Sequence, residues 1–490
     1  PIGDMVKLAG PTTQSESGGT GAGSDLLGRF LEGTGWTDEP ATAPGRAHRS
    51  SDNTYGRWAS AGVAGGLRPI GTPLVCSGCD AAVLRYYAPI FEAHGLEPTT
   101  GGGGASEGGP PRPLEPGTGI GGALVSGDLS LTGIGTLTHV DGNRVFAFGH
   151  PLLGTGPMQM PMTQAEILLT FPSSDSSFKI ANATRPVGTI LRDGLTAIMG
   201  EVGRVTPTVP LTVRVASPAG RRLFHYELLR HRAWTPVMVA VTTANSLVKS
   251  TEFDASATLA LRYRIDIEGF PPLETEDLYS GTNPAQPVHL ALANEAGGLF
   301  GLIYGNPFEE PHVRGVDLDV EVLRESQVAT ISSLRATEAE VRPGEPFKVT
   351  AILSPFRGED RQVTWEVTLP EDTGPGETQI IVGGGPAIDG LDRRVIERQL
   401  AQSSGLGDLL RLVGRQRKSR GLYLRVTKRS PSAIIRSEIL PELPLSIFSV
   451  FNSPRLSADT TLMIEAPIME IGKDLDLIAV GARRISVKVK

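Results

Sequence analysis

The sequence predicts a mainly β protein with some α-helix, and three observations support this fold class. Several short segments alternate apolar and polar residues with the period of a strand, as in "VPLTVRVAS" (209–217). The Asp141-Gly142 dipeptide between "GTLTHV" and "RVFAFG" is typical of a two-stranded hairpin. Helical periodicity is confined to a few segments. Because 490 residues exceed what one hydrophobic core organises, we expect roughly two to four domains.

The helices that the pattern predicts are few and have recognisable ends. "DAAVLRYYAPIFEAHG" (80–95) places apolar residues on one face and ends at a glycine. Thr235-Pro236 is a typical helix start, with proline in the first turn. Further helices are expected within 284–305 and over about 388–402 and 406–416.

Composition changes along the chain predict its division into regions. Glycine (60) and proline (38) concentrate in two stretches, of which "TTGGGGASEGGPPRP" is typical of a linker. Alternating apolar residues around Val349 and Trp365, bounded by turn signals, favour an immunoglobulin-like β-sandwich. The predicted regions are an N-terminal region (1–97) with a Gly/Ser/Pro-rich loop (11–64), a linker (98–118), a mostly β domain (119–326), an immunoglobulin-like sandwich (327–385) and a C-terminal α+β region (386–490).

Charge and hydropathy exclude several classes of partner. The formal net charge of −7 predicts no bulk attraction to nucleic acid or anionic lipid. No apolar run reaches the roughly 20 residues of a membrane span. The chain begins at Pro1 with no signal peptide, so we expect a processed or incomplete product whose export signal lay in a missing N-terminus.

Two short motifs carry little functional weight. Gly117, Gly119 and Gly122 form a G-x-G-x-x-G string, but it precedes a predicted strand rather than opening a helix, which argues against nucleotide binding. Cys76 and Cys79, the only cysteines, have C-x-x-C spacing; a zinc site would need two more ligands. A local disulfide or a pair of half-buried thiols is favoured over redox catalysis, which stays open as a third hypothesis. No cofactor and no metal are predicted.

His150 is the strongest candidate for chemistry. It follows the predicted strand "RVFAFG" directly and precedes "PLLGTG", so it lies on a loop with unusual backbone demands. General-base histidines often occupy such strand ends. From the residues alone, a structural role for His150 remains the favoured alternative.

The segment "GTGIGGALVSGDLSLTGIGTLTHVDGNRVFAFGHPLLGTGPMQMPMTQAEI", extended by "VGTILRDGLTAIMGEVG", resembles the peptidase domain of stage IV sporulation protein B (SpoIVB-type) serine peptidases. The shared pattern is a Gly-Ile-Gly entry, "GTLT-V-D", a strand ending in "GH", a glycine-rich loop and an "A/G-E-I" segment. The resemblance covers roughly residues 117 to 205 and weakens toward 290.

The resemblance implies a trypsin-like β-barrel serine peptidase. It assigns the general base to His150, and Asp193 is the candidate for the acid that orients the imidazole. The family's G-x-S-G-S-P nucleophile motif is absent from this sequence, and we expect it shortly upstream of Pro1. The alternative is a non-catalytic structural or assembly protein of the cell envelope built on the same fold.

The same resemblance implies a location and partners. We expect an exported protein, periplasmic or at the cell surface, that meets a protein or peptide substrate or an envelope protein partner. The sequence makes no prediction of oligomeric state.

Overall fold

The computed structural model describes residues 71–101, 113–171, 178–253, 257–281, 287–435, 438–440, 442–452 and 460–490. The predicted loop over 11–64 lies outside these residues. Two compact units divide the chain. We call them the barrel unit, which takes its described residues from Gly21–Ser326 and Ile396–Gln416, and the sandwich unit, which takes them from Gln327–Val395 and Arg417–Lys490. The prediction of a mainly β protein with some α-helix is confirmed.

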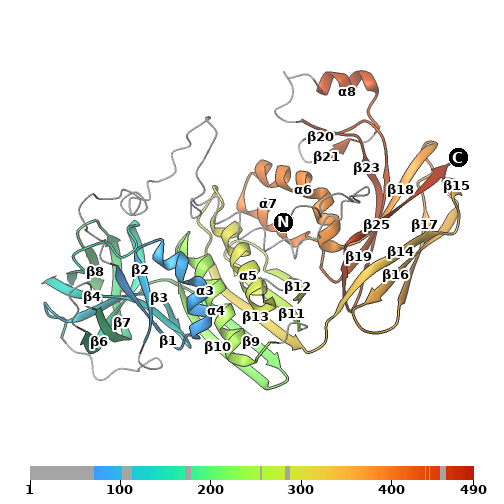
Figure 1. Cartoon of the computed structure of the whole chain (residues 1–490). Helices are drawn as coiled ribbons and strands as arrows, with labels where there is room; N and C mark the ends of the chain where they lie inside the picture. Colours follow the sequence, from blue (N-terminus) through green and yellow to red (C-terminus); the bar gives the residue numbers. More distant parts are fainter. Residues whose placement is uncertain are drawn as a thin grey trace, which may run out of the picture. The chain divides into compact units, whose positions relative to one another are not determined.

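The barrel unit is organised around one continuous sheet (Figure 1). Its order is β12-β11-β13-β9-β10-β3-β6-β7-β8-β5-β4-β1-β2, with an additional pairing of β3 with β4. The strands are β1 Thr72–Ser77, β2 Leu96–Thr100, β3 Gly119–Gly127, β4 Ser130–Asp141, β5 Arg144–Ala147, β6 Gly156–Phe171, β7 Phe178–Asp193, β8 Ile198–Val202, β9 Thr208–Ser217, β10 Gly220–Leu229, β11 Thr258–Ile267, β12 Leu273–Ser280 and β13 Val313–Leu323.

Part of this sheet closes on itself. β3 pairs with both β4 and β6, and the ring continues through β7, β8 and β5 back to β4, with every pairing antiparallel. The result is a closed barrel of six strands, whose interior is filled by alternate side chains such as Ile120, Met160 and Ile190. The predicted hairpin at Asp141-Gly142 joins β4 to β5 and is confirmed.

The strands outside the barrel carry helices on one side. β1 and β2 are parallel and are joined by α3 (Ala81–Glu92), whose N-cap Asp80 accepts a hydrogen bond from the amide of Ala82. At the other end, α4 (Trp234–Ser250) packs against β9 and β10, and α5 (Val288–Tyr304) packs against α4, β11 and β12. α7 (Leu406–Gly414) also contacts β12. The predicted N-terminal region thus shares one sheet with the barrel strands.

The sandwich unit consists of two facing sheets over one hydrophobic core. One sheet has the order β17-β16-β14-β24 and the other β15-β25-β18-β19-β23. The strands are β14 Val328–Ala336, β15 Glu340–Val341, β16 Pro346–Pro355, β17 Arg361–Thr368, β18 Gly376–Gly384, β19 Gly421–Lys428, β23 Ala466–Asp474, β24 Ile478–Val480 and β25 Ala482–Val489. Trp365 of the first sheet and Leu424 of the second are both buried in this core.

This arrangement differs from the predicted division at residue 385. Strands from the predicted C-terminal region complete the sandwich, because β18 pairs with β19 on one side and β25 on the other. Alternation within a strand does not reveal which distant strand it pairs with. α6 (Gly385–Gln402) follows β18, and a small sheet of β20 (Ser432–Ile435), β21 (Glu438–Leu440) and β22 (Thr460–Met463) with α8 (Leu445–Phe451) extends from β19.

Candidate functional site

The loop that carries His150 begins with an unusual backbone conformation directly after β5. β5 ends at Ala147, and both Phe148 (φ 75°) and Gly149 (φ 78°) adopt the left-handed conformation. Apart from Phe148, only Glu442 among the described non-glycine residues has a positive φ. A bulky residue in this region is strained, so the surrounding contacts must hold it. The Phe148 amide donates to the carbonyl oxygen of Thr136 at 3.0 Å and keeps the turn against β4.

Glycines in β3 and β4 make room for this loop. A Cβ on Gly135 would lie 2.5 Å from the Phe148 ring, and one on Gly133 would lie 2.4 Å from Leu152. A Cβ on Gly122 would likewise meet Leu152, at 2.6 Å. Real Cβ atoms do not approach so closely. The glycine-rich pattern therefore serves close packing of the loop on the barrel, and Gly119 and Gly122 lie within strand β3 rather than at a helix start.

The imidazole of His150 is held through one nitrogen. Its Nδ1 lies 2.8 Å from the carbonyl oxygen of Pro151 and 3.4 Å from the Oγ1 of Thr72. A carbonyl oxygen only accepts, so Nδ1 carries the proton and Nε2 of the neutral ring has a lone pair. Nε2 has no hydrogen-bond partner among the described residues. The ring is half-buried and stands edge-on to Phe148, with the centroids 5.8 Å apart.

Asp193 lies beside the same loop but contacts its backbone. This residue ends β7 and is only 2% exposed. Its Oδ1 accepts from the amide of Leu152 at 2.8 Å, and its Oδ2 accepts from the amides of Leu153 and Gly154 at 2.5 and 2.7 Å. Hydrogen bonds to a charged acceptor are stronger than neutral ones, so this carboxylate clamps the loop firmly.

The structure thus brings the two predicted catalytic residues to one loop without bonding them to each other. The hydrogen bonds that the described residues give Asp193 all come from backbone amides, and the acceptor of the His150 Nδ1–H is Pro151. The predicted role of Asp193 as the acid that orients the imidazole directly is therefore corrected. Asp193 holds the segment that follows His150, which makes it a positioning residue.

The hydroxyl nearest to the imidazole does not have the geometry of a nucleophile. Thr72 begins β1, is 1% exposed, and approaches the Nδ1 side of the ring rather than Nε2. A base on Nε2 would have to activate a hydroxyl on the opposite edge of the ring. No such hydroxyl is hydrogen-bonded to His150 within the ranges that the structure describes.

The two cysteines are free thiols, so the disulfide considered from the sequence is not formed in this structure. Cys76 on β1 is 2% exposed and Cys79 is half-buried. The pKa of Cys76 is raised, first by its hydrogen bond with Cys79 and then by burial. No cluster of three or more His, Cys, Asp or Glu side chains suited to a metal occurs in the described part of the chain. None of its helices is long and apolar enough to cross a membrane.

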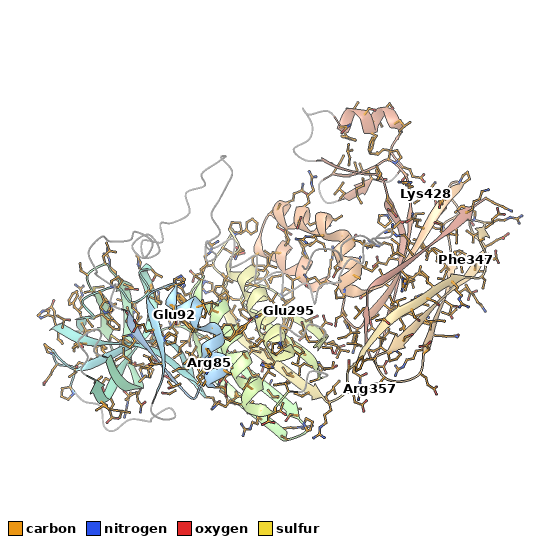
Figure 2. All side chains as sticks on the ribbon, viewed as in Figure 1. Arg85, Glu92, Glu295, Phe347, Arg357 and Lys428 are labelled. Atoms are coloured by element: carbon orange, nitrogen blue, oxygen red, sulfur yellow. The ribbon has the colours of Figure 1, made fainter. Side chains whose placement is uncertain are left out.

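Glu295 is an ionisable group that the sequence analysis did not single out (Figure 2). It lies on α5, where the Tyr279 hydroxyl of β12 donates to its Oε1 at 2.9 Å. Burial raises the pKa of this carboxyl to about 8, the Tyr279 bond lowers it and the nearby Asp277 raises it further. A usable signal was present in the sequence, because Glu295 is the only acidic residue of a mostly apolar helix.

Comparison with known proteins leaves the function to be argued from this site. No protein-family model, no curated protein and no solved structure matches the chain.

Proposed function

We propose that the protein is a serine peptidase of the SpoIVB type in which His150 is the general base. The observation that carries this proposal is the state of the ring. Nδ1–H is committed to the Pro151 carbonyl, which leaves the Nε2 lone pair free at the edge of a closed antiparallel barrel. This is the tautomer that a general base in a serine peptidase needs.

The chemistry follows from that tautomer. Nε2 takes the proton of the attacking serine hydroxyl and later returns it to the leaving amine. The resulting imidazolium has positive charge next to the Pro151 carbonyl dipole, which takes the place of the usual carboxylate partner. Asp193 acts indirectly: it fixes the amides of residues 152–154, and this loop in turn sets the orientation of the His150 ring.

The serine is expected on the segment upstream of Pro1. Among the described residues, the hydroxyl nearest to the imidazole is that of Thr72 at the start of β1, 3.4 Å from Nδ1. In this proposal the barrel is one half of a trypsin-like pair, and the sandwich unit is an immunoglobulin-like module of an exported protein that acts on a protein or peptide substrate.

One observation favours a second function. The Asp193 carboxylate is fully engaged by backbone amides, as expected of a residue whose work is to fix a loop. The alternative is accordingly a non-catalytic, exported structural or assembly protein that keeps the peptidase fold and contacts envelope proteins. In that case the conformation of the His150 loop has only a packing role.

Labelling with a fluorophosphonate separates the two functions. The probe is applied to the full-length protein that includes the sequence upstream of Pro1, and we expect one serine of that sequence to be labelled. His150→Ala should abolish the labelling, whereas His139→Ala, an exposed histidine of the same barrel, should leave it unchanged. An upstream sequence without a G-x-S-G-S-P motif, or a full-length protein that takes no label, would decide for the non-catalytic function.

A further inference from the structure

The turn between β1 and α3 holds two sulfurs in a fixed relationship. Cys76 is on β1, and Cys79 immediately precedes the helix N-cap Asp80. Between them the chain bends at Gly78, whose φ of 76° brings it into the left-handed region. A Cβ on Gly78 would lie 2.7 Å from the carbonyl oxygen of Asp128, so only glycine fits at this bend.

A buried side chain of α4 fixes this turn from outside. Asn245 is 1% exposed; its Oδ1 accepts from the amide of Asp80 at 2.8 Å, and its Nδ2 donates to the carbonyl of Gly78 at 3.2 Å. Both residues that flank Cys79 are therefore bonded to one amide group. The two thiols are held within hydrogen-bonding reach of each other, at the margin of the same hydrophobic core.

The two thiols differ in the way that thiol–disulfide exchange requires. Cys76 is sealed in the core, while Cys79 is half-buried and reachable from solvent. The hydrogen bond with Cys79 and burial in the core raise the pKa of Cys76, so its thiolate is hard to form. Exchange requires the attacking sulfur to reach the small disulfide, and of the two sulfurs only that of Cys79 is open to solvent.

We propose that Cys76 and Cys79 are a reversible redox pair in which Cys79 attacks and Cys76 resolves. In the first step the Cys79 thiolate attacks a low-molecular-weight disulfide, forms a mixed disulfide and releases one small thiolate. In the second step the Cys76 thiol loses its proton and attacks the Cys79 sulfur, which releases the second small thiolate. The small disulfide is reduced to two thiols while the protein pair is oxidised, so two electrons and two protons leave the protein.

The position of the pair gives its oxidation a structural consequence. The disulfide would join Cys76, near the end of β1, to Cys79, which precedes the N-cap of α3, across a bend that Asn245 already holds. Closing a loop of this kind stabilises a fold mainly by restricting the unfolded chain, although a short loop contributes less than a long one. This inference does not depend on the peptidase proposal, since His150 takes no part in it.

Exchange with oxidised glutathione, followed by intact-mass measurement, tests the order of attack. The reduced wild-type protein should lose two hydrogen atoms and retain no glutathione. Cys76→Ala should accumulate one glutathione adduct, because no second thiol resolves it. Cys79→Ala should react at least about tenfold more slowly, because its remaining thiol is buried and the thiolate is hard to form there.

Two controls keep the test decisive. Cys76→Val fills the same apolar site and replaces Cys76→Ala if the latter does not fold, as judged by circular dichroism. The proposal is overturned if the wild type keeps both thiols under conditions that modify the Cys76 variant. It is equally overturned if Cys79→Ala reacts as fast as Cys76→Ala while both are folded.

Discussion

The Oδ2 of Asp193 lies 2.7 Å from the amide nitrogen of Gly154, and this contact joins the end of β7 to the loop that follows His150. Two further amides of the same loop bind the same carboxylate. The relationship explains how a histidine that follows two left-handed residues keeps one orientation. It also makes the stability of the barrel and the direction of the imidazole depend on one buried side chain.

We expect Asp193→Asn to destabilise the barrel unit by about 2–4 kcal/mol, because the new amide group would face donors where an acceptor is required. Urea unfolding measures the loss, and hydrogen exchange should show faster exchange of the amides of residues 152–154. Asp141→Asn, an exposed residue at the β4–β5 turn, is the matched control and should change stability by less than about 0.5 kcal/mol. Equal stability of the two variants would show that the hydrogen bonds of Asp193 to the loop do not stabilise the barrel unit.

Gly133→Ala should be costly because the new methyl group would lie 2.4 Å from Leu152. Overpacking of this kind typically costs about 1–3 kcal/mol. Addition of Leu152→Ala should recover part of that loss, since it removes the clashing side chain. Gly390→Ala in α6 meets nothing within 4 Å and should be neutral or slightly stabilising. Thermal unfolding measures the relative stability of these variants. A Gly133→Ala protein as stable as wild type would disprove the packing argument.

Glu295 makes stability depend on pH. Its folded-state pKa of about 8 is above the ordinary value of 4.5, so between these values the folded state binds a proton that the unfolded state releases. Stability from this group is complete below about pH 4.5 and is lost as the pH rises through about 8. The slope can reach about 1.4 kcal/mol per pH unit.

Glu295→Gln removes that titration while it keeps the size of the side chain. Unfolding measured from pH 5 to 9 should therefore show a flatter decline for this variant than for wild type, whereas Glu274→Gln, an exposed residue of the adjacent strand, should leave the slope unchanged. The same slope in Glu295→Gln and wild type would show that the carboxyl titrates normally.

The sandwich unit depends on a buried arginine. Arg425 of β19 donates through both terminal nitrogens to Asp392 of α6, and its Nε donates to Glu470 of β23 at 2.8 Å. Its side chain is 6% exposed. Arg425→Met removes the more buried of the two arginines that contact Asp392 and Glu470, while Arg417 still contacts both. We expect a loss of about 3 kcal/mol.

The matched control for Arg425 is an exposed ion pair of the same unit. Arg361 and Asp476 lie 2.7 Å apart with both side chains more than half exposed. Arg361→Ala should cost less than about 1 kcal/mol in the same urea titration. Similar losses in the two variants would show that burial of Arg425 contributes nothing.

Local patterns predicted much of the fold, and long-range pairing set the rest. The alternation of Val209, Leu211, Val213 and Val215 placed one face of β9 in the core, and the Asp-Gly turn located the β4–β5 hairpin. Closure of the barrel depends on β3 pairing with two strands at once, which no local period encodes. The predicted boundary at 385 divides the sandwich because β18 pairs with β19 and β25, two strands that lie beyond that boundary.

The site shows the same limit. The "GH" loop identified His150, and the residue type of Asp193 suggested a direct contact with it. The actual partners of Asp193 are backbone amides, which every residue except proline has and which no sequence pattern marks. The contact of the His150 ring with the Pro151 carbonyl, which fixes the tautomer, could not be predicted either, because a backbone carbonyl is also present in every residue.

The central claim is that the barrel presents His150 as a base with Nε2 free. Nitrogen-15 chemical shifts of the His150 ring, assigned by comparison with His150→Gln, measure the tautomer directly. We predict a neutral ring protonated on Nδ1, with the Nε2 resonance typical of an unprotonated nitrogen. A ring protonated on Nε2 at neutral pH would contradict the account, because it could not accept a proton from a serine on that side.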